Sequence, residues 1–527
     1  MYIVKEEMGF SPPEFSTYVS AAAGSSLPGK SRKQYGSPER LIGYDGGTVI
    51  MKEIFLHEIR GAIFGGKALV AFVLMLAAFL ISLGMMSREY DRRLENYSMS
   101  ISLPAEQLFW NKIFFWEFDD GDFTSSDNST EPLAKVKEPD PMIFFARGFD
   151  TEMRQGVAFL ANFPIIELSK EPEQEKNLLH LMFPAPDLLF MVKVLVSLLA
   201  MVFAYNIFCG EREQGTLKLM LSAGASRGAV FGGKFLGGLV SVWTAFTAAF
   251  LVYLLALSFL TPVSLGGDAA ARVALIYAVS LLHIAVFFGL GAVISAFTRN
   301  SAPSMVLTLF VWIVVVFVLP GLAALTAQQF APVDSEDKVA RLKFEKATDM
   351  EREYAEANPG VTRSYSGSYG ARHDEIRHLI AAELQKIDDE NERSKALQTA
   401  LTSNLARVSP VGSLSHLFTS LSRTGIDDVR LFREDLLEIR TEMDRIFTEF
   451  VQDPNFLQLY MEGRFDIPEE ILEVARPFID VNRTAKFSVP SLSETLASTW
   501  IDFGLLGFFA VAAAALTFTR FIFYDPR

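Results

Sequence analysis

The sequence contains very little cysteine and has no excess of positive charge. Among its 527 residues there is one cysteine, Cys209, and 48 lysines and arginines stand against 62 aspartates and glutamates, which gives a net charge of −14. A single cysteine excludes an intrachain disulfide and a metal site built from several cysteines. The acidic balance argues against a nucleic-acid-binding protein, because such proteins need cationic surface for the phosphate backbone. We therefore expect a chain that is held together by packing and has no nucleic-acid partner.

Apolar residues are abundant and are concentrated in blocks. Hydrophobic residues make up 50% of the chain and charged residues 21%, a composition that disordered proteins do not have. Several blocks have about the 20 residues that a helix needs to cross ~30 Å of hydrocarbon, where a helix satisfies its own backbone hydrogen bonds. The sequence therefore predicts a mainly α, polytopic membrane protein with six transmembrane helices, at residues 68–86, 188–209, 235–261, 273–298, 302–327 and 499–522.

Lysine and arginine in the short connections predict the orientation of these spans. The connections on one side of the six spans all carry these residues, whereas the short connection on the other side, 262–272, has one arginine. Lysine and arginine are retained in the cytoplasm. We therefore expect a multi-pass protein of the plasma (inner) membrane with both termini, residues 210–234 and the tail 523–527 in the cytoplasm. Two long polar segments, described next, are then extracytoplasmic.

The two long polar segments differ in their sequence patterns. Residues 87–187 are acidic and rich in aromatic residues and proline, which is typical of an irregular mixed module. Residues 328–498 are predicted to be a mostly helical module, with helices at 371–407 and 427–450 and with Gly425 ending the preceding helix in a left-handed conformation. We expect the second module to fold as an independent domain. The alternative is a set of helices that is stable only when docked on the rest of the chain.

The chain before the first span has two parts. Residues 1–50 contain proline and glycine pairs without sustained periodicity, so they are predicted to be a weakly ordered tail. Met51 is an alternative start of the protein. Residues 51–67 place three apolar residues at i, i+4 and i+8, which predicts an amphipathic helix that lies in the membrane interface.

The connection between spans two and three carries the most informative motif. It reads Cys-Gly-Glu-Arg-Glu-Gln-Gly-Thr-Leu-Lys-Leu-Met-Leu-Ser from Cys209 to Ser222, followed by a small loop that ends in Ser-Arg at Arg227. This stretch, together with the six spans, resembles the ABC-2 type transporter permeases, in which an E-R-E-x-G-T-L-x-x-L-L-S-like sequence follows the second span. The resemblance covers about residues 51–327 and 499–527. It departs from many members at Gly224, where they have proline.

The resemblance implies a permease subunit of an ABC exporter that forms the transmembrane pathway. It implies cytoplasmic ABC ATPase subunits as partners, with ATP and magnesium bound there and no cofactor in this chain. A second permease subunit, in a homodimer or a heterodimer, the lipid bilayer and an extracytoplasmic protein are the other expected partners. The alternative function is a non-transporting scaffold or mechanotransmission subunit of an ATPase-driven envelope machine. The residues implied in ATPase coupling are Glu211, Arg212, Glu213, Gly215, Thr216, Leu217, Leu221, Ser222 and Arg227.

The residues of this motif also have a physical interpretation of their own. Glu211 and Glu213 suit the positive end of a helix dipole, and Leu217, Met220 and Leu221 form an apolar face at helical spacing. Such a face can dock in a groove of a soluble partner. A charged interfacial connector that only turns the chain is the alternative. The ordered match to the whole motif favours the docking helix.

Other stretches with chemical potential are better explained by structure. Residues 61–67 and 228–234 resemble phosphate-binding loops, but each lacks the Ser or Thr that holds magnesium, and neither follows a predicted strand. Each is interpreted as a flexible entry to a membrane helix, with its lysine at the lipid headgroups. We expect His283, inside span four, to be a neutral imidazole that is hydrogen-bonded to a neighbouring helix. The chain is therefore expected not to be an enzyme and to have no catalytic, cofactor-binding or metal-binding residues.

Overall fold

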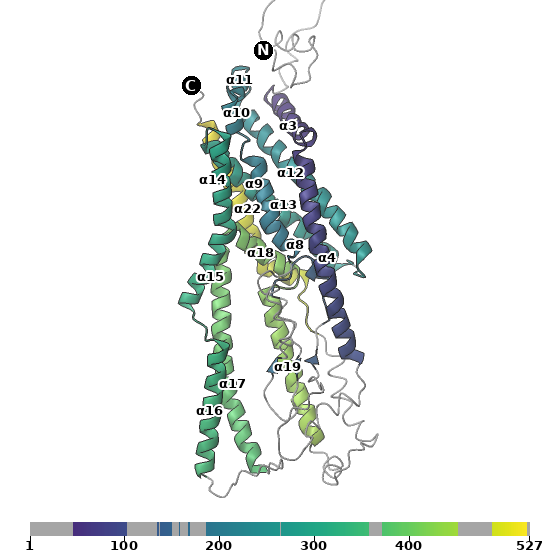
Figure 1. Ribbon diagram of the computed structural model, residues 1–527, viewed down its shortest axis with the longest axis vertical. Helices are drawn as coiled ribbons and strands as arrows, with labels where there is room; N and C mark the ends of the chain where they lie inside the picture. Colours follow the sequence, from purple (N-terminus) through teal and green to yellow (C-terminus); the bar gives the residue numbers. More distant parts are fainter. Residues whose placement is uncertain are drawn as a thin grey trace, which may run out of the picture. The chain divides into compact units, whose positions relative to one another are not determined.

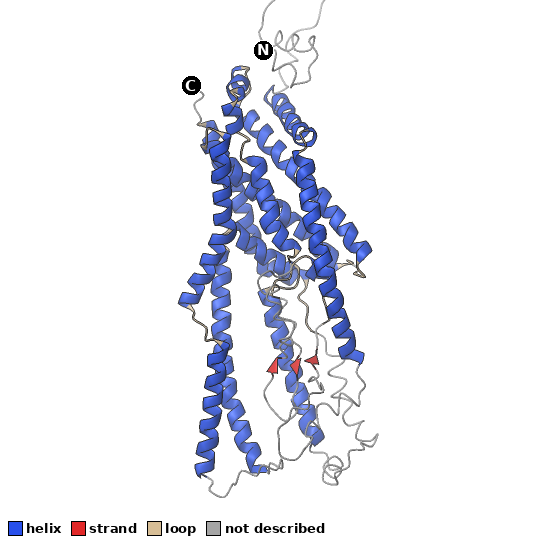
Figure 2. Cartoon of the chain, in the orientation of Figure 1, coloured by secondary structure: helices blue, strands red, loops and turns tan. Residues whose placement is uncertain are grey.

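The computed structural model describes residues 46–102, 134–135, 138–149, 157–158, 167–168, 186–263, 265–357, 371–451 and 487–523. The chain divides into two units, 1–48 and 49–527, and nearly all described residues belong to the second. These residues are mainly helical (Figure 2). Most of the predicted tail 1–50 and most of the segment 103–185 lie outside the described residues.

Six helical stretches of the described residues are long and apolar enough to cross a membrane (Figure 1). They confirm the six predicted spans, and each extends beyond the apolar block from which it was predicted. The first helix continues into polar sequence, where Glu89 pairs with Arg92 and Arg93 at the i+3 and i+4 spacing that stabilises helices. The spans are formed by α4 (Lys67–Ser102); by α8 (Leu188–Met191), η4 (Val192–Val196), α9 (Ser197–Ala204) and α10 (Cys209–Glu213); by α12 (Arg227–Leu260); by α13 (Asp268–Phe297); by α14 (Ser301–Ile313), η5 (Val314–Val318) and α15 (Leu319–Phe330); and by α22 (Leu492–Ile522).

Spans two and five each contain one π turn, η4 and η5. In span five the cause is local, because Pro320 has no backbone N–H with which to continue the ladder of helical hydrogen bonds. In span two the Ser197 hydroxyl donates to the carbonyl oxygens of Lys193 and Val194 at 2.5 and 3.1 Å, and so satisfies carbonyl groups of the widened turn. Span four differs, since α13 is α-helical along its whole length.

The main hydrophobic core follows α13, which packs against α9, α12 and α22, while α4 packs against α12. Aromatic rings fill the contact between α4 and α12. Phe79 meets Phe246 and Tyr253 edge to face, with ring centroids 6.1 Å apart in both pairs. Edge-to-face pairs place the positive ring edge on the negative face and add to the stability gained from burial.

Part of the first long polar segment is packed into this bundle. The short 3₁₀ helix η2 (Pro141–Phe144) and the two residues after it are buried. The Tyr253 hydroxyl donates to Phe144 O at 2.8 Å, and Leu189 N donates to Phe145 O at 3.0 Å. The strands β1 (Ala134–Lys135), β2 (Val157–Ala158) and β3 (Glu167–Leu168) pair antiparallel in that order. The predicted irregular, mixed structure of the rest of the segment lies outside the described residues.

The second long polar segment contains four described helices: α16 (Glu336–Ala357), α17 (Ala371–Ala406), α18 (Pro410–Leu421) and α19 (Ile426–Val451). The helices predicted at 371–407 and 427–450 are therefore confirmed. The predicted role of Gly425 is wrong, because the left-handed residue after α18 is Arg423, with φ +57°. Gly425 instead precedes α19, and its N–H donates to Asp428 Oδ2 at 2.9 Å.

The largest buried apolar side chains of this segment belong to the core of the bundle. Leu414, Leu417, Phe418 and Leu421 of α18 are fully buried within the main core. Among the described residues of the segment, a second, smaller cluster consists of Phe432 and Leu436, with Val429 and Phe487 packed against it. The packing of α18 favours the alternative of helices that depend on docking, and the stability of residues 328–498 on their own stays a prediction.

Candidate coupling site

The connection between spans two and three is formed by α10 and by α11 (Thr216–Ser222). Gly215 between the two helices has φ +73°, and Gly224 after α11 has φ +93°. This left-handed region favours glycine. A proline, whose φ is fixed near −65°, is excluded at position 224. The turn after α11 is therefore different from a turn built with proline.

Lys234 of α12 lies between two carboxylates. Its Nζ donates to Glu211 Oε1 of α10 at 2.7 Å and to Glu58 Oε1 of α3 (Gly46–Phe64). Lys234 is 5% exposed, so its predicted position at the lipid headgroups is wrong. The lysine can be buried because two carboxylates balance its charge. The Thr216 hydroxyl donates to the other carboxylate oxygen of Glu211, which ties the first residue of α11 to the same group.

Glycines on α12 allow α3 to approach closely enough for this contact. A Cβ atom on Gly233 would lie 2.7 Å from Ile54 Cβ, and one on Gly237 would lie 2.8 Å from Glu58 Cβ. Both distances are too short for real Cβ atoms, so the two helices can touch only where α12 has no side chain. The helix predicted at 51–67 is confirmed as far as Phe64, where α3 ends, and this contact brings Glu58 to Lys234.

Arg212 and Glu213 hold the facing ends of spans four and five. Arg212 Nη1 donates to the carbonyl oxygens of Ala296 and Thr298, at 2.8 and 2.9 Å, at the C-terminal end of α13. Glu213 Oε2 accepts a hydrogen bond of 2.9 Å from Ser301 N at the N-terminal end of α14. A cation at a helix C-terminus and an anion at a helix N-terminus are both stabilised by the helix dipole.

Two further contacts complete the attachment of this segment. Ser295 Oγ of α13 accepts hydrogen bonds from Phe208 N and Cys209 N, at 3.0 and 3.1 Å, where α10 begins. Arg227 Nη1, at the start of α12, donates to Ile522 O at the end of α22. Charged residues of the motif thus fasten α10 and the start of α12 to the ends of the other helices. We call Glu211, Arg212, Glu213 and Arg227, with these partners, the polar joint.

The apolar side of α11 is not available for a partner. Leu217 is buried in the main core, and Met220 and Leu221 are partly buried against it. The expectation that these residues form an open docking face is therefore wrong. The outward side of α11 presents Leu219, which is 57% exposed, and Ser222, whose hydroxyl donates to Leu219 O at 2.9 Å.

The sequence identified the residues of the polar joint that lie in the motif and missed their partners elsewhere in the chain. It identified Glu211 in the motif, but Glu58 and Lys234 are separated by 176 residues and nothing local connects them. A usable signal was the repetition of small residues four apart on α12, at Gly233 and Gly237, because such spacing is typical of close helix contacts in membranes. Gly233 also belongs to the stretch 228–234, which is interpreted from the sequence as a flexible entry to the span.

His283 does not have the hydrogen bond that was expected for it. The residue is fully buried in α13, and neither ring nitrogen has a hydrogen-bond partner among the described residues. The imidazole packs on Phe287, with ring centroids 4.6 Å apart. The contact is aromatic rather than polar.

Six helices long and apolar enough to cross a membrane, with their ends joined by the polar joint, define a multi-pass membrane protein. The sequence model of the family described as ABC-2 family transporter protein matches residues 52–523, so the chain belongs to this family. The match includes the second long polar segment, 328–498, which the resemblance drawn from the sequence leaves out. No curated protein matches the chain. The family is a membrane component of ABC transporters and is not itself catalytic.

Proposed function

We propose that this chain is the permease subunit of an ABC exporter, in which separate cytoplasmic ATPase subunits bind ATP and magnesium and act on the segment α10–α11. The polar joint is the observation that supports this proposal. In the proposed arrangement two permease subunits form the pathway in the plasma (inner) membrane, with both termini in the cytoplasm. The asymmetry of lysine and arginine in the short connections supports this orientation.

The polar joint supplies a physical route for coupling. A displacement of α11 moves α10 through Thr216 and Glu211, which share a hydrogen bond. Helix α10 in turn holds α13 through Arg212 and α14 through Glu213. A force applied to one short segment therefore reaches several spans without a change in their internal packing.

The exposed side of α11 is the proposed contact with the ATPase. Leu219 is an apolar side chain that projects from this side, and an apolar anchor in a pocket is typical of protein interfaces. Leu217 and Leu221 support the same contact from inside, because they fix α11 on the core. Gly215 and Ser222 lie at the two ends of the exposed surface.

Leu219→Asp tests this assignment, with Leu397→Asp on α17 as the matched control. The two leucines are 57% and 56% exposed, so neither change disturbs a core. We expect Leu219→Asp to lower copurification of the ATPase and stimulated ATP hydrolysis by about tenfold, a loss of roughly 1.4 kcal/mol of binding energy. Leu397→Asp should change neither. Equal results for the two variants would contradict the proposed contact.

The alternative, a mechanotransmission subunit, is supported by the attachment of the polar-segment helices to the spans. Gln398 Nε2 of α17 donates to Ala331 O, directly after α15, at 2.9 Å, and Arg407 pairs with Asp502 of α22 at 3.0 Å. Movements of spans five and six would thus be carried into α17. A small molecule or lipid that copurifies with the complex and is released on ATP addition would favour export over this alternative.

A further inference from the structure

Helix α18 is embedded in the end of the bundle that is remote from the polar joint. Its last residue, Leu421, contacts the first turn of α13 through Arg272, whereas the polar joint holds the last turn of α13. Helix α18 packs against α13, α22, η4 and η5, and therefore touches spans two, four, five and six. Leu414 and Leu417 are fully buried among them. A short apolar helix thus occupies the place where four spans meet.

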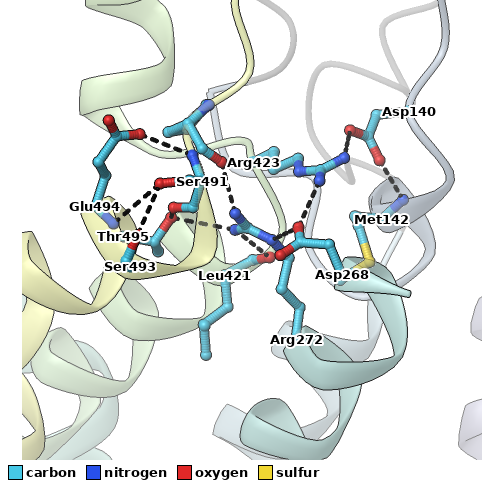
Figure 3. A network of polar contacts seen from close by, with 11 residues as sticks. Asp140, Met142, Asp268, Arg272, Leu421, Arg423, Ser491, Ser493, Glu494 and Thr495 are labelled. Atoms are coloured by element: carbon cyan, nitrogen blue, oxygen red, sulfur yellow. Dashed lines mark hydrogen bonds and ion pairs between the residues drawn. The ribbon is translucent and has the colours of Figure 1, made fainter. Parts of the chain in front are cut away.

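One fully buried arginine fastens the C-terminal end of α18 (Figure 3). The guanidinium of Arg272 donates to Leu421 O at 3.4 Å, to Pro490 O at 2.7 Å and to Thr495 Oγ1 at 3.2 Å. It also pairs with Asp268 at 2.6 Å, one helical turn away. A single side chain thereby joins α18 to the beginnings of α13 and α22.

A second arginine extends this cluster. Arg423 follows α18 in the left-handed conformation, which is unfavourable for a residue with a side chain. Its guanidinium pairs with Asp268 at 2.7 Å and with Asp140, before η2, at 3.0 Å (Figure 3). The two arginines and two aspartates balance each other in charge. We call these four residues the first clamp.

The N-terminal end of α18 has a clamp of its own. Arg407, at the end of α17, pairs through Nε with Asp502 Oδ1 of α22 at 3.0 Å, and His416 Nδ1 of α18 lies 2.9 Å from the other carboxylate oxygen. Asp502 is fully buried. The Ser409 hydroxyl donates to Val315 O in the π turn of span five at 3.3 Å. Arg407, His416 and Asp502 form the second clamp.

Each clamp contains one fully buried charged side chain, Arg272 or Asp502, while their partners Asp268 and Arg407 are 39% and 20% exposed. The buried charge can leave its partner only where water reaches it, because an uncompensated buried charge is strongly destabilising. Two clamps at the two ends of one helix therefore favour two discrete positions of that helix, one with Arg272 and Asp502 paired and buried and one with both hydrated. An apolar contact alone would allow α18 to shift gradually between these two positions.

We propose that α18 is a gate that closes the transport pathway at the end opposite the polar joint and is held shut by the two clamps. In the described conformation the gate is closed, because the apolar face of α18 is buried among the spans. Opening separates the clamps and exposes the face of Leu417 to water. The pathway and the role of ATP in opening it rest on the proposed function, whereas the packing of α18 and its two clamps do not.

The test measures access of water-soluble reagent to the buried face of α18 in the full-length protein in membranes. In a Cys209→Ser background, Leu417→Cys places a thiol on this face, and its rate of reaction with a small charged methanethiosulfonate is followed. Arg423→Gln weakens the first clamp. Arg433→Gln is the matched control, because it removes an ion pair of α19 with Glu392 of α17 away from the gate. Ala249→Cys, at a fully buried position of α12, reports general loosening.

We expect Arg423→Gln to speed labelling at position 417 about tenfold, which corresponds to a tenfold shift of the equilibrium towards the open gate. Arg433→Gln should leave this rate unchanged, and position 249 should stay unreactive in both variants. If Arg423→Gln does not insert into the membrane, Asp502→Asn weakens the second clamp with little change in shape and should have the same effect. Unchanged labelling at position 417, or equal acceleration at position 249, would overturn the gate.

Addition of the ATPase and ATP to the protein with the intact clamps separates the two proposals. Faster labelling at position 417 supports a gate that is driven by the ATPase. If the clamp variants accelerate labelling and ATP does not, the gate stands and the proposed coupling through the polar joint is wrong.

Discussion

Lys234→Met removes the buried positive charge that two partly buried carboxylates share in the polar joint. Loss of one partner from a buried pair costs about 3–5 kcal/mol, because the remaining charge is left without compensation. The side chains of Glu58 and Glu211 are 26% and 24% exposed, so water can reach part of each carboxylate. We therefore expect a loss below that range, about 2–3 kcal/mol, and a fall of roughly 5 °C in melting temperature.

The native cysteine provides the assay. Cys209 is fully buried at the beginning of α10, so a thiol-reactive fluorogenic dye reports unfolding of the detergent-solubilised, full-length protein. Lys338→Met is the matched control, since Lys338 forms an exposed pair with Asp334 at 2.7 Å. Exposed pairs of this type contribute about 0–1 kcal/mol, so the control should melt within about 1 °C of the parent protein.

A triple variant decides whether the charge is the cause. Lys234→Met combined with Glu58→Gln and Glu211→Gln leaves no charge in the buried contact, and should recover at least half of the lost stability. If the triple variant melts as low as Lys234→Met alone, packing of the lysine side chain and not charge compensation holds α3, α10 and α12 together. The electrostatic account of the polar joint would then be refuted.

Three further predictions concern packing, folding and orientation. Gly237→Ala should lower the melting temperature although alanine is the better helix former, because its Cβ would lie 2.8 Å from a side chain of α3. Gly228→Ala, whose Cβ would have nothing within 4 Å, should not lower it, and equal effects of the two variants would contradict the close contact. Residues 328–498 expressed alone should lose helical circular dichroism without cooperativity on heating, since their largest apolar cluster belongs to the bundle; a sharp transition would contradict this. In intact cells that express a cysteine-free variant, a cysteine introduced at Leu397 should react with a membrane-impermeant reagent and one introduced at Ser226 should not. The reverse result would overturn the proposed orientation.

Hydropathy was sufficient to predict the six spans, because a helix in hydrocarbon needs a fixed length of apolar sequence. It did not predict where the helices end. Helix α4 continues to Ser102 through pairs of opposite charge, and α12 begins at Arg227 within the predicted connector. Helix ends are set by capping and local charge, which a window of average hydropathy does not detect.

The motif after span two could be recognised from the sequence, but its geometry could not. Amphipathic spacing correctly placed Leu217 and Leu221 on one face of α11, and gave no information on whether that face meets a partner or the core of the same chain. The partners of Lys234 and Arg272 lie far away along the sequence. Such contacts depend on which helices are neighbours, and local sequence patterns do not specify this.

Helix α13 connects the two functional regions. Arg212 of the polar joint is bonded to the carbonyl groups at its C-terminal end, and Arg272 of the first clamp lies in its first turns. Thirty residues of α-helix extend about 45 Å, and an uninterrupted helix has no hinge at which a displacement could be absorbed. Spans two and five have such points at η4 and η5, and both π turns contact α18. The rigid α13 therefore transmits a displacement of α10 to the residues that pack against α18. Spans two and five, which also contact α18, can bend at their π turns during this movement.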